Sequence, residues 1–219
     1  MTVAAGRSDA SSLGRFITLE GGEGAGKSTQ VARLATWLES RQRTVLATRE
    51  PGGSPGAEMV RKLLVEGPAD RWDGTTEALL HFAARRDHLR STVWPAVKHG
   101  TWVISDRFAD STRAYQGYGH GIDLVLLDGL YAVAVGDFRP DLTLILDLPV
   151  ETGLARAASR HGVETRYESL PRAFHDRVRK GFLEIAAREP KRCAVIDASQ
   201  DIDAIAGAIA RSVGERLGA

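Results

Sequence analysis

The stretch FITLEGGEGAGKST, residues 16–29, decides the fold of this 219-residue chain. Its first five residues form a mostly apolar run, which is typical of a strand buried on both faces. The next eight, GGEGAGKS, fit the pattern G-x-x-x-x-G-K-[ST] at the junction of a strand and a helix. Glycines let backbone N–H groups turn around phosphate oxygens, and the helix that begins there adds the positive end of its dipole. The stretch therefore predicts a nucleoside-triphosphate site.

Two side chains of this loop have a distinct chemical task. Lys27 is expected to neutralise the β- and γ-phosphates, and the Ser28 hydroxyl is suited to ligate Mg²⁺. A phosphate loop does not identify a reaction by itself, because GTPase switches, ATP-driven motors and small-molecule kinases share it. The predicted nucleotide-binding residues of the loop are Gly21, Gly22, Glu23, Gly24, Ala25, Gly26, Lys27, Ser28 and Thr29.

Apolar runs and helical stretches alternate along the rest of the chain, which predicts an α/β fold built on a parallel sheet. The predicted strands span residues 16–20, 44–48, 102–106, 142–147 and 193–197. The predicted helices span residues 27–41, 57–65, 76–99, 123–136, 150–159, 171–188 and 202–217. In such a sheet the binding loops follow the carboxyl ends of the strands. We therefore expect a single domain over residues 15–219, with a five-stranded parallel sheet flanked by helices.

Composition and charge argue against several classes of protein. Hydrophobic residues make up 43% of the chain and charged residues 26%, which argues against disorder and against fibrous repeats. The 29 basic and 28 acidic residues nearly cancel, so a protein that coats nucleic acid is not expected. The one cysteine, Cys193, cannot form an internal disulfide, and no apolar run approaches the ~20 residues of a membrane helix. We expect a cytoplasmic protein that binds neither a nucleic-acid polymer nor a membrane.

Two segments are expected to lie outside the rigid core. Residues 1–14, MTVAAGRSDASSLG, are small and polar and are expected to form a flexible tail. Residues 160–169, RHGVETRYES, are a polar, glycine-containing gap between two predicted helices. We expect this gap to act as a small mobile lid.

Two arginines follow strands close to the phosphate loop. Arg107 stands directly after Asp106 at the end of a predicted strand, where it is well placed to bind a second anion. Arg49 comes just before the turn at Pro51, where backbone approaches a ligand. Taken singly, each has a purely structural explanation, a salt bridge to Asp106 in one case and a Pro-Gly turn in the other.

The predicted helix 76–99 carries an aromatic ring next to guanidinium groups. Phe82 and Arg86 are four residues apart and share one helix face, so a base could stack on the ring and bind the guanidinium. A core phenylalanine with an exposed arginine explains the same spacing. An extra arginine, Arg85, precedes Arg86, and the sequence leaves open which of the two reaches the base, although the spacing favours Arg86.

The chain as a whole resembles the thymidylate kinase family. The segments that carry the resemblance are, in order, FITLEGGEGAGKST, TREPGG, LLHFAARR, GTWVISDRFADSTRAYQG and GDFRPDLTLILDL. The resemblance as a whole extends over about residues 15–200. REPGG together with DR…AYQG after a phosphate loop separates this family from other nucleotide kinases. The resemblance implies a P-loop nucleoside monophosphate kinase fold, and transfer of phosphate from ATP to dTMP in the presence of Mg²⁺, giving ADP and dTDP for dTTP synthesis.

The resemblance also implies roles on the acceptor side. Phe82 would stack on thymine and Arg86 would bind its edge, whereas Arg49 and Arg107 would hold the phosphate of dTMP. Tyr115 would crowd the 2′ position of the sugar and so favour deoxyribose. The full implied set, in which Thr112 and Gln116 contact the base, is Arg49, Phe82, Arg86, Asp106, Arg107, Thr112, Tyr115 and Gln116.

The implied catalytic residues are Glu23, Lys27, Arg107 and Arg166. The small Gly24 resembles a bacterial subtype that takes its extra arginine from the lid, where Arg160 would lie over adenine and Arg166 would reach the transferring phosphates. Residues 197–200 resemble the loop that flanks adenine in the family. The resemblance further implies a cis bond between Glu50 and Pro51, and assembly into a homodimer through long helices.

Two other functions are weighed against this one. A deoxynucleoside kinase would not need the pair of arginines, Arg49 and Arg107, that suits an acceptor already carrying phosphate. A nucleotide-dependent switch or ATPase would carry a water-positioning glutamine or an N-K-x-D pattern, and the sequence shows neither.

Overall fold

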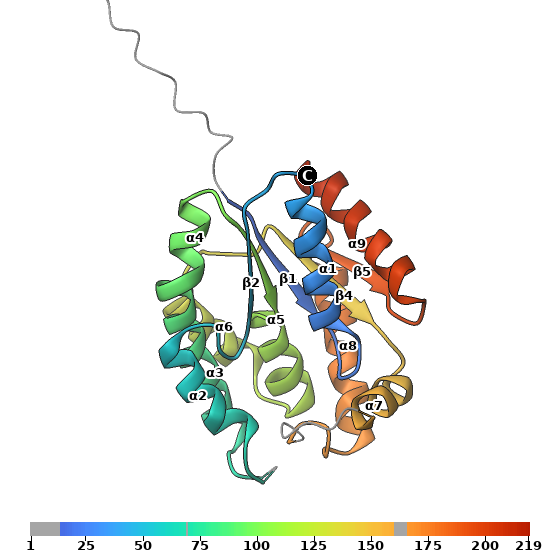
Figure 1. Ribbon diagram of the computed structural model, residues 1–219. Coiled ribbons are helices and arrows are strands. Elements are labelled where there is room, and N and C mark those ends of the chain that lie inside the picture. Colours follow the sequence, from blue (N-terminus) through green and yellow to red (C-terminus); the bar gives the residue numbers. More distant parts are fainter. Residues whose placement is uncertain (1–13, 69, 160–165) are drawn as a thin grey trace, which may run out of the picture.

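Five parallel strands form the centre of the molecule, and helices cover both faces of the sheet (Figure 1). The computed structural model describes residues 14–68, 70–159 and 166–219. The strand order is β2-β3-β1-β4-β5, and each neighbouring pair runs parallel, which confirms the predicted sheet. The strands are β1 (Phe16–Glu20), β2 (Val45–Arg49), β3 (Trp102–Asp106), β4 (Leu142–Asp147) and β5 (Cys193–Asp197).

Four strands have the predicted bounds, and β2 begins and ends one residue later than predicted. Because β2 lies at the edge of the sheet and is only partly buried, its apolar pattern marks its ends weakly. The register pairs Arg49 with Asp106, and Asp106 with Leu19 of β1. The carboxyl ends of β2, β3 and β1 therefore meet at one edge of the sheet, as the sequence predicts.

The helices form a layer on each side of the sheet. On one side α1 (Lys27–Glu39) and α9 (Ile202–Leu217) bury residues such as Leu34 and Ile209 against the strands. On the other side lie α3 (Gly74–His88), α6 (Leu124–Ala134) and α8 (Arg172–Arg188), which contribute Phe82, Leu127 and Phe182 to the core. The bounds of α1, α6, α8 and α9 agree with the predicted ones within two residues.

The long helix predicted over residues 76–99 is interrupted. α3 ends at His88, a π-helical turn η1 (Leu89–Val93) follows, and α4 (Trp94–Lys98) completes the segment. Pro95 lies at the start of α4, where its missing N–H and its ring disturb the bonding of the preceding turn. The prediction of one continuous helix is therefore wrong, because it does not take this proline into account.

Two helical segments were not predicted at all. α5 (Ala109–Thr112) and the π-helical turn η2 (Arg113–Gly119) follow β3 directly. Their sequence, ADSTRAYQGYG, is rich in residues that favour turns, so it gives no helical pattern. The other two helices, α2 (Pro55–Val65) and α7 (Val150–Ala158), lie within two residues of their predicted bounds.

The predicted tail and lid fall mostly outside the described residues. Of the tail only Gly14 is described, and its N–H donates to the Val97 carbonyl at 2.9 Å. Of the lid, residues 160–165 are outside, whereas residues 166–169 are described. Among the described helices none is long and apolar enough to cross a membrane. Cys193 is buried in β5, and burial raises the pKa of its thiol to about 12.

Candidate active site

The loop between β1 and α1 has the geometry expected of a phosphate-binding loop. Lys27 folds back over it, and its Nζ donates to the carbonyls of Gly21 (3.2 Å) and Gly22 (2.8 Å). Gly24 has φ 68°, and a Cβ at this position would lie 2.0 Å from the carbonyl oxygen of Gly153 in α7. Glycine is therefore required at position 24 by backbone conformation and by space. Burial, with Arg107 nearby, lowers the pKa of Lys27 to about 8.

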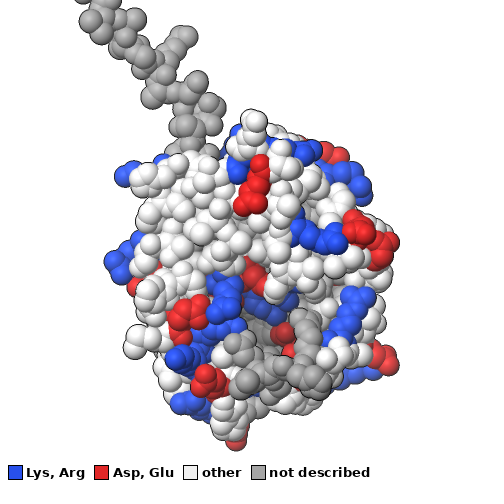
Figure 2. Space-filling model, in the orientation of Figure 1, with Lys and Arg blue, Asp and Glu red and all other residues white. Residues whose placement is uncertain are grey.

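A cavity of about 600 Å³ opens next to this loop at the carboxyl edge of the sheet. Figure 2 shows the hollow, with basic and acidic side chains gathered around it. Its lining comes from the phosphate loop, the ends of β2 and β3, and helices α2, α3, α5 and η2. The predicted site residues that line it are Glu23, Gly24, Ala25, Gly26, Lys27, Ser28, Arg49, Asp106, Arg107, Thr112, Tyr115, Gln116 and Arg166.

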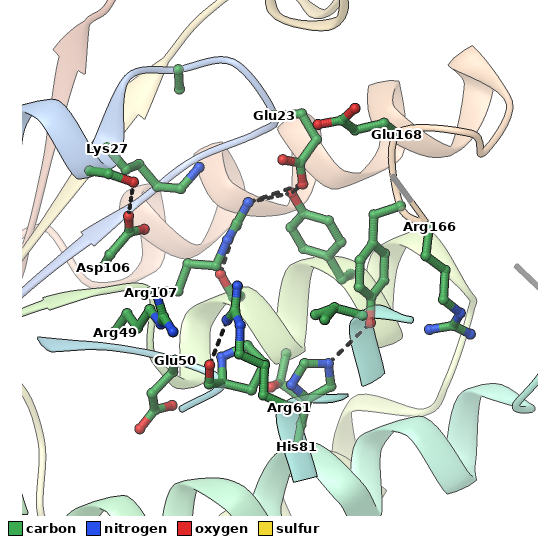
Figure 3. A pocket seen from close by; sticks show the side chains of 18 of the residues that line it. Glu23, Lys27, Arg49, Glu50, Arg61, His81, Asp106, Arg107, Arg166 and Glu168 are labelled. Carbon is green, nitrogen blue, oxygen red and sulfur yellow. Dashed lines mark hydrogen bonds and ion pairs between the residues drawn. The ribbon is translucent and has the colours of Figure 1, made fainter. Parts of the chain in front are cut away.

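Arg107 joins the phosphate loop to the opposite wall of the cavity (Figure 3). Its guanidinium donates to the Gly21 carbonyl, to Glu23 and to the Tyr115 hydroxyl, each at 3.0 Å, and to Ser111 at 3.1 Å. Burial alone would raise the pKa of Glu23, but the positive charges of Arg107 and Lys27 outweigh it and lower the pKa to about 2. Glu23 is therefore ionised and holds Arg107 beside the loop.

Ser28 and Asp106 meet where α1 begins and β3 ends. The Ser28 hydroxyl donates to the Asp106 carboxylate at 2.6 Å. A hydroxyl and one carboxylate, supplemented by substrate phosphates and water, are the oxygen ligands that Mg²⁺ typically takes in kinases. The described residues contain no group of three or more His, Cys, Asp or Glu side chains that could hold a metal ion. A metal ion at this point would therefore take its other ligands from substrate phosphates and water. The donor set at this point therefore suits Mg²⁺.

The end of β2 and helix α2 each bring one arginine to the cavity. Arg49 forms an ion pair with Glu58 of α2 at 3.2 Å, and both side chains remain accessible. Arg61 of α2 also lines the cavity and donates to the Pro51 carbonyl at 2.6 Å. The Glu50–Pro51 bond is cis, which confirms that prediction.

Phe82 does not line the cavity, which corrects the expectation that it stacks on a base. Its side chain is buried in the core with Phe108 and meets Tyr131 edge-on at 6.4 Å between ring centroids. Successive residues of a helix point in different directions, so the preceding residue, His81, takes the cavity side of α3. His81 Nε2 lies 3.1 Å from the Tyr167 hydroxyl, and burial lowers the pKa of the imidazole to about 4.

Arg86 is exposed and faces away from the cavity, which corrects the expectation that it binds the base. It bonds to the Ala134 carbonyl of α6 and lies over the Trp94 ring. Arg85 lies instead behind the cavity wall and donates to Glu50 (2.7 Å) and to Thr112 (3.1 Å), both of which line it. The Nη1 nitrogen of Arg85 is buried and has no hydrogen-bond partner among the described residues.

The lid arginine Arg166 reaches the cavity, but on the side away from Lys27 (Figure 3). It is buried in an ion pair with Glu77 of α3 at 2.7 Å and donates to the Leu64 carbonyl at 3.1 Å. The other lid arginine, Arg160, lies outside the described residues. The structure therefore places Arg166 against α3 and not against the phosphate loop, where the sequence interpretation expected it.

Other residues around the site were missed in the sequence interpretation. Arg61 and His81 line the cavity, and Glu77 is buried at its edge. Arg156 of α7 donates to the Ala198 carbonyl at 3.3 Å, in the loop resembling the family's adenine-flanking segment. His81 stands four residues before Arg85, the same spacing as Phe82 and Arg86, so the spacing that singles out Phe82 and Arg86 also fits the pair on the cavity side of α3.

Comparison with known proteins gives a consistent result. The thymidylate kinase family model matches residues 19–209. The chain is 56% identical to the thymidylate kinase of Caulobacter vibrioides, with 94% of this chain and 98% of the relative covered. It is 50% identical to the thymidylate kinase of Bradyrhizobium diazoefficiens, with 94% and 92% covered. The crystal structure of thymidylate kinase from Ehrlichia chaffeensis matches with a TM-score of 0.76 and 35% identity, covering 91% of this chain and 98% of that one.

Proposed function

This chain belongs to the thymidylate kinase family and phosphorylates dTMP to dTDP, and from that premise we propose how its residues bind and act on the two nucleotides. The observation that carries the proposal is the position of Arg107, bonded at once to the phosphate loop and to η2 on the other side of one cavity. An acceptor phosphate held there lies next to the donor phosphates. An oxygen of the dTMP phosphate attacks the γ-phosphorus of ATP, the bond to the β,γ-bridging oxygen breaks, and ADP leaves.

The donor side of the site binds ATP through the phosphate loop. Backbone N–H groups of residues 21–29 and Lys27 hold the phosphates, and Ser28 with Asp106 holds Mg²⁺. An ion held by these residues would supply positive charge against the charge that develops on the phosphates during transfer. Arg156, beside the loop at Ala198, lies at the adenine end, a place that the sequence interpretation gave to Arg160.

The acceptor side binds dTMP between β2, α3 and η2. Arg49, Arg61 and Arg107 supply positive charge for its phosphate. At the base end His81 lines the wall, and Arg85 behind the wall offers its buried, unpartnered Nη1 nitrogen to an oxygen of the pyrimidine. Tyr115, held by Glu23 at 2.6 Å, faces the sugar and disfavours a 2′-hydroxyl.

Arg166 has a different role in this proposal from the one expected from sequence. Moving it to the transferring phosphates would leave Glu77 as an unpaired buried charge, which is costly. We propose that Arg166 holds residues 166–169 of the lid against α3 through its ion pair with Glu77.

The same premise extends to assembly and location. One side of α6 exposes apolar residues, with Val125 75% and Val133 84% exposed, and Leu79 of α3 is 50% exposed. An apolar surface of this kind fits an interface between two copies of the chain. We propose a homodimer through α3 and α6, located in the cytoplasm, with one catalytic domain per chain over residues 15–219.

The experiment that tests the function is a coupled assay of ADP release. It compares dTMP, dUMP, dCMP, dGMP, AMP and thymidine as acceptors, and a reaction without acceptor measures ATP hydrolysis alone. The Lys27→Met variant gives the background that does not arise from this site, because it lacks the charge that supports the β- and γ-phosphates. We expect turnover with dTMP to exceed all other rates and to disappear in the variant.

Two results would contradict this function. Preference for thymidine over dTMP would identify a deoxynucleoside kinase, since Arg49 and Arg107 would then have no acceptor phosphate to bind. ATP turnover that does not depend on any acceptor would identify an ATPase.

A further inference from the structure

Glu77 of α3 is a buried carboxylate at the base end of the cavity, with 1% of its surface exposed. Its Oε1 accepts hydrogen bonds from Gln116 Nε2 and from the Tyr167 hydroxyl, both at 2.6 Å. Its Oε2 pairs with Arg166 at 2.7 Å. Burial alone would raise the pKa of Glu77, but these donors and the neighbouring positive charge outweigh it and lower the pKa. Glu77 is therefore ionised.

An ionised carboxylate only accepts hydrogen bonds, and this fixes the direction of the bonds around it. Gln116 must turn its NH₂ group toward Glu77, so its carbonyl oxygen lies on the other side of the amide. Tyr167 gives its proton to Glu77, so its oxygen can only accept from His81 Nε2–H. His81 is neutral because burial lowers the pKa of its imidazole, so Nδ1 carries a lone pair.

Two cavity-lining side chains are therefore left with acceptors for a ligand, and both orientations are set by Glu77. Arg85 does not line the cavity but lies behind its wall, where it bonds to the lining residues Glu50 and Thr112. Its Nη1 nitrogen is buried without a partner among the described residues and is the complementary donor for a base that reaches this wall. Thymine offers an acceptor at O4 and a donor at N3–H, whereas cytosine offers a donor at N4 and an acceptor at N3. A site of fixed acceptors beside a fixed donor matches the first pattern and opposes the second.

We propose that Glu77 is the positioning residue that makes this enzyme select a pyrimidine with a ring N–H donor and reject cytosine. Glu77 does not contact the substrate; it acts through Gln116 and, by way of Tyr167, through His81. The inference rests on the proposed location of the base at this end of the cavity. A polar site that leaves groups unpaired with the wrong ligand can discriminate strongly, because a buried group without a partner loses its hydrogen bonds to water and gains none in return.

The test is the ratio of kcat/KM for dTMP to kcat/KM for dCMP, measured in wild type and in Glu77→Gln. The amide at position 77 can donate as well as accept, so it no longer holds the Gln116 amide group in one orientation. We expect the ratio to fall about tenfold or more, and a factor of ten corresponds to about 1.4 kcal/mol. Glu77→Asp keeps the charge and should retain most of the ratio.

A matched control is Asp73→Asn at the start of the same helix. It removes one carboxylate but keeps a good N-cap, so the ratio should not change. If Glu77→Gln does not fold, Tyr167→Phe serves as the second variant. It removes the hydroxyl that fixes the tautomer of His81, and we expect the dTMP/dCMP ratio of kcat/KM to fall about 2- to 10-fold.

The outcomes separate this inference from the function itself. A folded Glu77→Gln enzyme that loses activity on dTMP and dCMP equally would show that Glu77 is only structural, and would overturn the proposal. If Glu77→Gln does not fold, an unchanged dTMP/dCMP ratio in Tyr167→Phe would likewise overturn the proposal. A wild-type enzyme that does not phosphorylate dTMP would instead refute the proposed function.

Discussion

At the scale of single residues, the orientation of α3 decides which of its side chains face the cavity. The pairs His81 with Arg85 and Phe82 with Arg86 have the same spacing, so periodicity cannot choose between them. The choice is made by packing, because Phe82 fills a core position with Phe108 under the sheet. The phosphate loop depends on local sequence alone, and its residues and geometry were therefore predictable.

The assignment of the base to Arg85 gives a first prediction. Arg85→Lys keeps the positive charge but loses the forked guanidinium that bonds to Glu50 and Thr112 and that we propose binds the base. We expect the KM for dTMP to rise about tenfold or more, with the KM for ATP nearly unchanged. Arg86→Lys is the matched control on the exposed face, and steady-state kinetics should show wild-type values. Equal effects of the two substitutions on the KM for dTMP would contradict the assignment of the base contact to Arg85.

A second prediction separates His81 from Phe82. His81→Ala removes a ring that lines the cavity, and we expect weaker dTMP binding by roughly 1–3 kcal/mol with stability little changed. Phe82→Ala empties a core position and should lower the free energy of unfolding by about 3–5 kcal/mol. Calorimetric titration with dTMP and urea unfolding of both variants measure the two effects. The assignment fails if Phe82→Ala proves stable and loses only dTMP affinity.

A third prediction concerns Glu20 at the end of β1. It is fully buried and accepts hydrogen bonds from the Phe108 N–H (2.7 Å) and the Ser111 hydroxyl (2.5 Å). Burial, with the charge of Asp110 nearby, raises the pKa of Glu20 from 4.5 to about 8. A carboxyl with a raised folded pKa gives stability that is complete below its unfolded pKa and is lost as pH rises through the folded pKa.

The stability of the wild type should therefore decrease between about pH 5 and pH 9, and Glu20→Gln should flatten this part of the profile. Urea midpoints measured across this range for both proteins provide the check. Parallel profiles would mean that Glu20 is already ionised at neutral pH.

At the scale of elements, strands were predicted better than helices. A strand buried on both faces is a short apolar run, and four such runs have the predicted ends. α5 and η2 could not be predicted in this way, because they hold polar residues that line the cavity and bond to neighbouring loops. The segment thus shows a local preference for turns that tertiary packing overrides.

The short lid segment 166–169 gives a fourth prediction, since its arginine is paired with α3. Arg166→Lys keeps the charge but weakens the contacts with Glu77 and Leu64. Because Glu77 also holds Gln116, we expect the KM for dTMP to rise more than kcat falls. Arg172→Lys, a change to an exposed side chain at the start of α8, serves as the control. A fall in kcat of about 10³ with an unchanged KM would instead place Arg166 at the transferring phosphates.

At the scale of the whole molecule, α6 and α9 lie on opposite sides of the sheet (Figure 1). α6 has a side of exposed aliphatic residues, Val125, Leu126 and Val133. This arrangement gives a fifth prediction, that Val133→Asp converts a dimer into a monomer by placing a charge in an apolar interface. Light scattering after size-exclusion chromatography measures the mass. Ile202→Asp, on α9, should leave the mass of the assembly unchanged, and a wild type that is already monomeric would refute the interface.

The buried thiol of Cys193 has a practical consequence for studying this enzyme in solution. Thiol reagents react with the thiolate, and a thiol whose pKa is raised to about 12 within β5 is almost entirely protonated at neutral pH. A cysteine introduced at an exposed position, such as Met59 in α2, would therefore take a fluorophore or spin label selectively. Probes could then be attached to the otherwise native protein without first replacing its own cysteine, so that distances across the cavity can be followed during turnover.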